Sequence, residues 1–72
     1  MQSSIADDLA AETAREWSAD QRGERCFQTI NDAAEFCYYR AVRDGRASRA
    51  ESAEELGRIV RGVVKAARRV MG

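Results

Sequence analysis

Residues 52–71 read SAEELGRIVRGVVKAARRVM, and this stretch decides the fold. At the α-helical turn of about 100° per residue, its large apolar side chains fall into one stripe about 140° wide, and its cations lie opposite. One face is therefore predicted to be core, and the other to meet solvent or a partner. The apolar stripe consists of Leu56, Ile59, Val60, Val63, Val64, Ala67, Val70 and Met71.

Two overlapping capping boxes precede this stretch, Ser48-x-x-Glu51 and Ser52-x-x-Glu55. In each, a hydroxyl and a carboxylate three residues apart satisfy free N–H groups at a helix start. The predicted helix covers residues 48–71. Two glycines on the borders between its faces, Gly57 and Gly62, predict close approach of another helix, because each omits a side chain despite a cost of about 1 kcal/mol in helix propensity.

A helix is also predicted over residues 4–22 at the start of the chain. Ser4 and Asp7 form its capping signal, and Gly23 can take the left-handed conformation that ends it. Its large apolar residues are few, and acidic side chains intrude between them, so we expect this helix at the periphery. The large apolar residues of this helix are Ile5, Leu9 and Trp17.

The remaining helix is predicted over residues 24–44 and ends at the turn-forming pair Asp44-Gly45. Phe36 and Tyr39 point away from its apolar stripe. A helix that is apolar on two sides requires two neighbours or an interface with a partner. The stripe itself consists of Cys26, Phe27, Ile30, Ala33, Ala34, Cys37, Tyr38 and Ala41.

These patterns predict an all-α fold in a single domain of residues 1–72, because no stretch alternates with the period of a strand. We expect a small three-helix bundle, or an antiparallel hairpin of the last two helices with a peripheral N-terminal helix. That helix packs across the hairpin or swaps onto a partner. Because small cores rarely supply more than about 3 to 5 kcal/mol, we expect dimerisation to complete the fold.

Charge is segregated along the chain although its 12 basic and 12 acidic residues cancel. Residues 1–36 hold eight acids and three bases, net −5, whereas residues 37–72 hold four acids and nine bases, net +5. The acids of the first helix are expected beside the basic face of the third, within one chain or across a dimer. Two interpretations stay open for the charged faces: internally compensated surface, or a docking surface for an acidic partner. The acids of the first predicted helix are Asp7, Asp8, Glu12, Glu16 and Asp20.

The sequence argues against catalysis and against a metal or cofactor. It has no histidine, the commonest general base and metal ligand, no glycine-rich phosphate loop and no nucleophile elbow. The spacing of Cys26 and Cys37 matches no zinc motif, and on one continuous helix the two would be about 16 Å apart, too far for a disulfide. Both are expected to be small core residues, with an intersubunit bridge or a redox role as alternatives.

By elimination, the expected function is non-catalytic protein binding by a small inhibitor, anti-activator or adaptor. The expected partner-binding residues are Phe36, Tyr39, Arg40 and Arg43, because aromatic and arginine side chains most often dominate interface energies.

The alternative is a nucleic-acid-binding regulator. It is less favoured because the chain is neutral and its aromatics are not interleaved with its cations. This alternative uses the basic face of the third helix, which consists of Arg58, Arg61, Lys65, Arg68 and Arg69.

Location and origin are also expectations. No run of 18 apolar residues exists, so neither a transmembrane helix nor a membrane partner is expected. The absence of a secretory signal and the presence of only two cysteines favour the cytoplasm. Abundant arginine and alanine favour a bacterial or phage coding sequence, including a mobile element.

Overall fold

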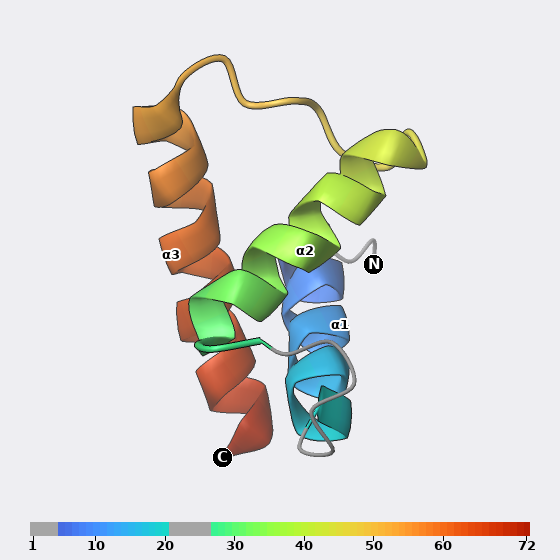
Figure 1. Cartoon of the computed structure of the whole chain (residues 1–72), viewed down its shortest axis with the longest axis vertical. Coiled ribbons are helices and arrows are strands. Elements are labelled where there is room, and N and C mark those ends of the chain that lie inside the picture. Colours follow the sequence, from blue (N-terminus) through green and yellow to red (C-terminus); the bar gives the residue numbers. More distant parts are fainter. Residues whose placement is uncertain (1–4, 21–26) are drawn as a thin grey trace.

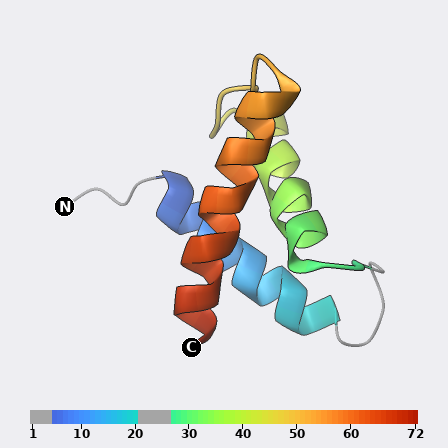
Figure 2. The same ribbon diagram turned by 90° about the vertical axis from the view of Figure 1, so that its left-hand side faces the viewer.

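The computed structural model describes residues 5–20 and 27–72, which form three α-helices and no strand. They are α1 (Ile5–Ala19), α2 (Ile30–Arg43) and α3 (Ala53–Met71). Helix α2 runs diagonally across α1 and α3, and α2 and α3 run in opposite directions (Figures 1 and 2). The all-α prediction is confirmed, and α1 packs across the hairpin within the same chain.

Helix α2 begins at Ile30, so the predicted start at residue 24 is wrong. Thr29 caps the helix: its hydroxyl accepts from the N–H of Asp32 at 3.3 Å, and the Asp32 carboxylate accepts from the N–H of Thr29 at 3.3 Å. Phe27 therefore precedes the helix, and its N–H donates to Asp20 at 2.8 Å. The predicted helix end at Gly23 and the predicted core residue Cys26 lie outside the described residues.

Of the two predicted caps of α3, the second is used. The Ser52 hydroxyl accepts from the N–H of Glu55 at 3.1 Å, and the helix begins at Ala53 rather than at residue 48. Residues 48–52 instead belong to the connector from α2. The Tyr38 hydroxyl ties this connector to α2 by donating to the carbonyl of Ser48 at 2.5 Å. An extended connector therefore replaces the predicted first turn of the helix.

Helix α1 is a central element, so the expectation that it is peripheral is wrong. Leu9 is 1% exposed and Thr13 is completely buried. Two alanines, Ala10 and Ala14, are buried beside them. The helix packs against both α2 and α3, and its contact with α3 is the most extensive in the fold. Small side chains allow such close packing, because the distance between helix axes depends on the side chains at the contact.

The middle of α3 forms core as predicted, and its end does not. Val60, Val63, Val64 and Ala67 are buried, whereas Val70 is 62% exposed and Met71 is 41% exposed. With 19 residues against 14 in α2, α3 is the longer helix, and its last turn extends past the first turn of α2 (Figure 1).

The two glycines of α3 do not mark helix crossings. A Cβ at Gly62 would have no described atom within 4 Å, and a Cβ at Gly57 would meet only the Arg61 side chain, at 3.4 Å. The predicted close approach at these glycines is therefore wrong. Gly62 instead leaves open space beside α3.

Candidate functional site

Three of the four residues predicted to bind a partner share the outer face of α2. At about 100° per residue, Phe36, Tyr39 and Arg43 fall within about 60° of one another, on the side opposite the buried Cys37. Tyr39 is 50% exposed, and the Arg43 side chain is 75% exposed. Arg40 lies at the border of this face, toward α1. We call Phe36, Tyr39 and Arg43 the α2 face.

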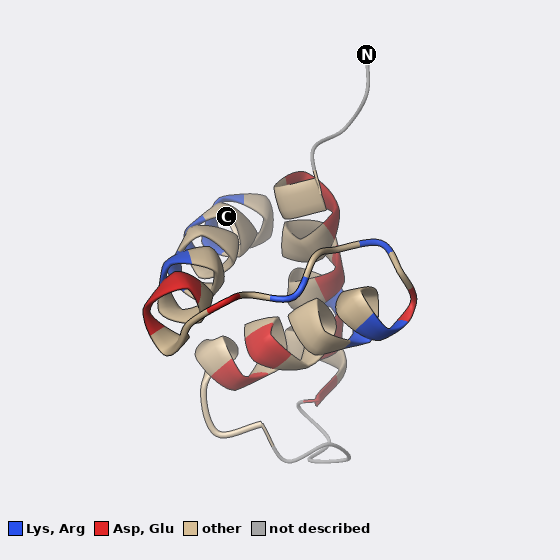
Figure 3. Ribbon diagram, turned by 90° about the horizontal axis from the view of Figure 1, so that it is seen from above, with Lys and Arg blue, Asp and Glu red and all other residues tan. Residues whose placement is uncertain are grey.

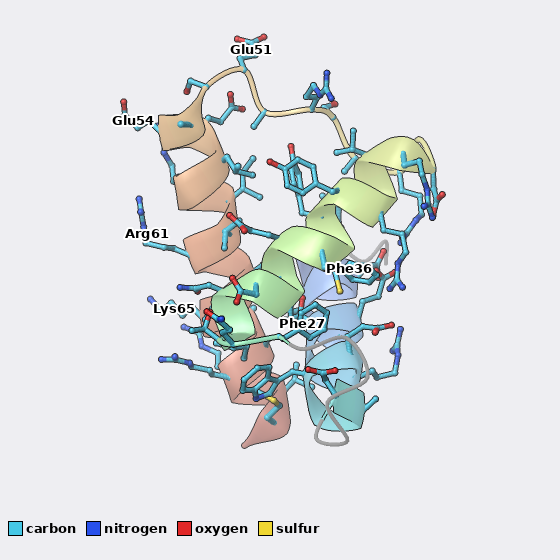
Figure 4. All side chains as sticks on the ribbon, viewed as in Figure 1. Phe27, Phe36, Glu51, Glu54, Arg61 and Lys65 are labelled. Atoms are coloured by element: carbon cyan, nitrogen blue, oxygen red, sulfur yellow. The ribbon has the colours of Figure 1, made fainter. Side chains whose placement is uncertain are left out.

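Phe36 is only partly available on this face. Its ring lies 5.6 Å from that of Phe27 at an interplanar angle of 57°, and the Arg40 guanidinium lies 5.2 Å from its centroid (Figure 4). Phe36 also packs against the core. Phe36 therefore has contacts within the chain as well as being a predicted partner-binding residue, because Phe27 lies outside α2 and its ring meets that of Phe36.

Arg40 and Arg46 neutralise the acids in the middle of α1. Arg40 donates to Glu16 at 3.2 Å and to Glu12 at 3.4 Å, and Arg46 donates to Glu12 at 2.6 Å. Hydrogen bonding from Arg46 lowers the pKa of Glu12 below its ordinary value of 4.5, against the opposing effect of burial and with help from Arg40. The expected pairing of Glu12 and Glu16 with α3 is therefore wrong: these acids are compensated by α2 and the turn after it.

The basic face of α3 is exposed along its whole length. Within residues 5–20 and 27–72, none of its five cations has a carboxylate within 4.0 Å, in contrast to Arg40 and Arg46. Arg61 and Lys65 point away from α1 and α2 (Figure 4), and Figure 3 shows acidic segments along α1 and basic segments along α3. From Arg58 to Arg69 the cations occupy a stripe about 100° wide and about 16 Å long.

Two hollows flank this basic face. A groove of about 510 Å³ lies on the α1 side, and Ile5, Leu9, Ile59 and Gly62 are among its lining residues. A second hollow of about 460 Å³ is lined by Asn31, Val64 and four of the cations, namely Arg61, Lys65, Arg68 and Arg69. The groove was missed in the sequence. Its only signal there was Gly62, which marks open space rather than a crossing.

The described residues hold no group of three or more histidine, cysteine, aspartate or glutamate side chains that could bind a metal ion. Cys37 is a buried free thiol, as expected of a core residue, and burial raises its pKa. A raised pKa disfavours the thiolate, which is the nucleophilic form. The argument that placed Cys26 and Cys37 on one helix does not hold, because α2 begins after Cys26.

No helix in the described ranges has the length and apolar character needed to cross a membrane. Comparison of the chain with protein-family models, with curated proteins and with solved structures found no match. The function therefore has to be inferred from the chain's own surfaces, which are the α2 face, the basic face of α3 and the groove beside it.

Proposed function

We propose that this chain is a non-catalytic regulator that binds another protein through the α2 face, as an inhibitor, anti-activator or adaptor. The observation that supports this most is the half-exposed Tyr39 ring, which lies 5.6 Å from the ring of buried Tyr38. An aromatic side chain already held in place loses little rotamer freedom on binding. Arg43 lies beside it with its side chain 75% exposed. Its Nε donates to the Asp44 carboxylate at 3.5 Å, so a partner would contact the other nitrogen atoms of the guanidinium.

Arg40 has a positioning role in this proposal. Its guanidinium lies over the ring of Phe36 while it donates to Glu12 and Glu16. These contacts fix the edge of the α2 face toward α1. Arg40 therefore orients Phe36 for the partner. Its own Nη1 and Nη2 atoms already donate to Glu16 and Glu12.

Site-specific crosslinking tests this function. A photoreactive residue is placed at Tyr39, and a control photoreactive residue at exposed Lys65, which points away from α1 and α2 (Figure 4). Any protein crosslinked in the native host is identified and purified. Its affinity is then measured for the wild type and for the Tyr39→Ala, Arg43→Glu double variant.

We expect the double variant to lose roughly tenfold or more in affinity at unchanged melting temperature. A protein that crosslinks equally from Tyr39 and Lys65, or that binds the double variant as tightly as the wild type, would contradict the proposal.

A homodimer formed through the α2–α3 hairpin and a cytoplasmic location remain parts of this proposal. Exposed apolar side chains at the end of α3, Val70 and Met71, support self-association. Sedimentation equilibrium at micromolar concentration decides the oligomeric state. A species of 8.0 kDa alone would exclude the dimer.

The second candidate function, nucleic-acid binding, is favoured by the cations of α3, which have no carboxylate of the described residues within ion-pair distance. Each phosphate contact contributes a slope of about −0.9 when the logarithm of duplex affinity is plotted against that of salt concentration. A steep slope that flattens in the Arg61→Glu, Lys65→Glu variant would support it. Duplex binding that does not respond to salt would exclude it.

A further inference from the structure

We infer that the groove between α1 and α3 and the basic face of α3 together form a second binding site, which takes an acidic amphipathic helix of another protein. This inference does not rest on the proposed function, because the α2 face contributes neither Tyr39 nor Arg43 to it. Arg58 joins the two parts: it lines the groove and is also the first cation of the basic face.

The groove supplies an apolar surface for the partner's apolar side chains. Ile5 is 40% exposed at its edge, and Ile59 is half-buried. Leu9, Tyr38 and Val63 also line the groove, and all three are almost completely buried. At about 510 Å³, its volume falls within the range of about 300 to 1,000 Å³ typical of binding pockets. Gly62 keeps it open, because no described atom would meet a Cβ there.

Charge identifies the partner as acidic. The charged side chains that line the groove are Arg46 and Arg58, and no described carboxylate lines it. Arg46 is already engaged by Glu12, whereas Arg58 has no described carboxylate partner. Four further cations continue from Arg58 along the exposed side of α3. The first turn of α3 carries Glu54 and Glu55, so the positive surface begins one turn into the helix.

The spacing of the cations suits a helix as the partner. Arg58, Arg61, Lys65 and Arg68 follow one another at intervals of three, four and three residues. Residues at alternating intervals of three and four stay on one side of a helix, so they can contact a second packed helix over several turns. A partner helix with carboxylates at the same repeat and apolar residues on the neighbouring side would meet the cations and the groove at once. About 11 residues span the 16 Å or so of this stripe.

Other occupants use only part of this surface. A nucleic-acid backbone would contact the cations and leave the apolar groove empty. A second copy of this chain would have to supply an acidic amphipathic helix, and in α1 the apolar side is already buried in the core while Glu12 and Glu16 are paired with arginines. The combination of groove and cations therefore points to a different protein.

The test is selection from a display library of helices of about 15 residues, with apolar residues on one face and Glu or Asp on the others. Selection on the full wild-type chain should enrich binders. Gly62→Leu should then weaken them roughly tenfold or more by filling the groove, whereas Gly62→Ala, which adds only a methyl group, should weaken them less. The Arg58→Glu, Arg61→Glu variant, changed only at exposed positions, should give a similar loss and does not depend on Gly62→Leu folding correctly.

Circular dichroism confirms that each variant keeps its helicity, and Tyr39→Ala should bind the selected helices like the wild type. Failure of the α2 face and failure of this site are thereby distinguishable. The inference is overturned if no helix is enriched, or if the enriched helices bind Gly62→Leu and the charge-reversed variant as tightly as the wild type. It is equally overturned if only duplex DNA binds, with the same affinity for the wild type and Gly62→Leu.

Discussion

Helices α1 and α3 both carry many charged side chains, but these differ in whether they form ion pairs within the described residues. In the middle of α1, Glu12 and Glu16 are paired with Arg40 and Arg46, and their side chains are only 14% and 20% exposed. On α3, the cations point outward, and no described carboxylate lies within ion-pair distance of them. Glu12 and Glu16 therefore help to hold α1 against α2 and the turn after it, whereas the cations of α3 stay exposed.

The two helices also bury their apolar faces differently. Helix α3 buries three valines and an alanine along a clear amphipathic stripe. Helix α1 buries one leucine, one threonine and two alanines, which together make a weak amphipathic pattern in the sequence. A helix with few large apolar residues can therefore still be central to the core. The following variants test how far each helix depends on its core and on its charges.

The largest effect is expected for Val63→Asp in α3. Val63 is 2% exposed, so an aspartate there would place an unpaired charge in the core. This should cost several kcal/mol, which is comparable to the whole stability of so small a domain, roughly 4 to 10 kcal/mol. Circular dichroism should show lost helicity at 25 °C. Helicity and melting temperature like those of the wild type would mean that the α3 stripe is not core.

A smaller but still large loss is expected for Leu9→Ala in α1. Removing a buried leucine side chain costs about 2 to 5 kcal/mol of unfolding free energy, measured by chemical denaturation. Ile5→Ala is the matched control in the same helix, because Ile5 is 40% exposed, and it should cost much less. Similar losses for the two variants would argue that α1 is peripheral after all.

Glu12→Gln should cost about 1 kcal/mol, because it removes the ion pairs to Arg40 and Arg46. The pKa of Glu12 is lowered in the folded chain, so its contribution is fully present above its ordinary value of 4.5 and is lost as pH falls through the lower folded value. Denaturation midpoints measured between neutral pH and acid should therefore converge for wild type and variant at low pH. A difference that persists in acid would mean that the loss does not come from the ion pairs.

The smallest effect is expected for the Arg61→Glu, Lys65→Glu variant of α3. Both side chains are exposed and lack described carboxylate partners, so unfolding free energy should change by no more than about 0.5 kcal/mol. Thermal melting at low and at physiological salt checks this. A clear loss of stability would mean that the basic face is compensated within the fold, like the acids of α1.

Local signals in the sequence were sufficient to predict the three helices and the buried residues of α2 and α3, but not the small buried residues of α1. Ser52-x-x-Glu55 marked the start of α3, and the apolar repeat around Val63 identified its buried side. The start of α2 was missed because Thr29-x-x-Asp32 has a shorter acid than the usual capping box, so that Phe27 was assigned to a helix that begins after it. Of the candidate site, exposed Tyr39 and Arg43 followed from helical periodicity, and so did the outward direction of the basic face.

The sequence by itself determined which side chains each helix presents on each side, because a helix fixes directions through its own hydrogen bonds and repeat. Only the tertiary structure decided which of those sides meet. It placed Arg40 and Arg46 against Glu12, folded Phe27 over Phe36, buried the alanines of α1 and left Gly62 beside an open groove. These contacts join residues distant in the chain, and they depend on how three helices of unequal length pack around one small core.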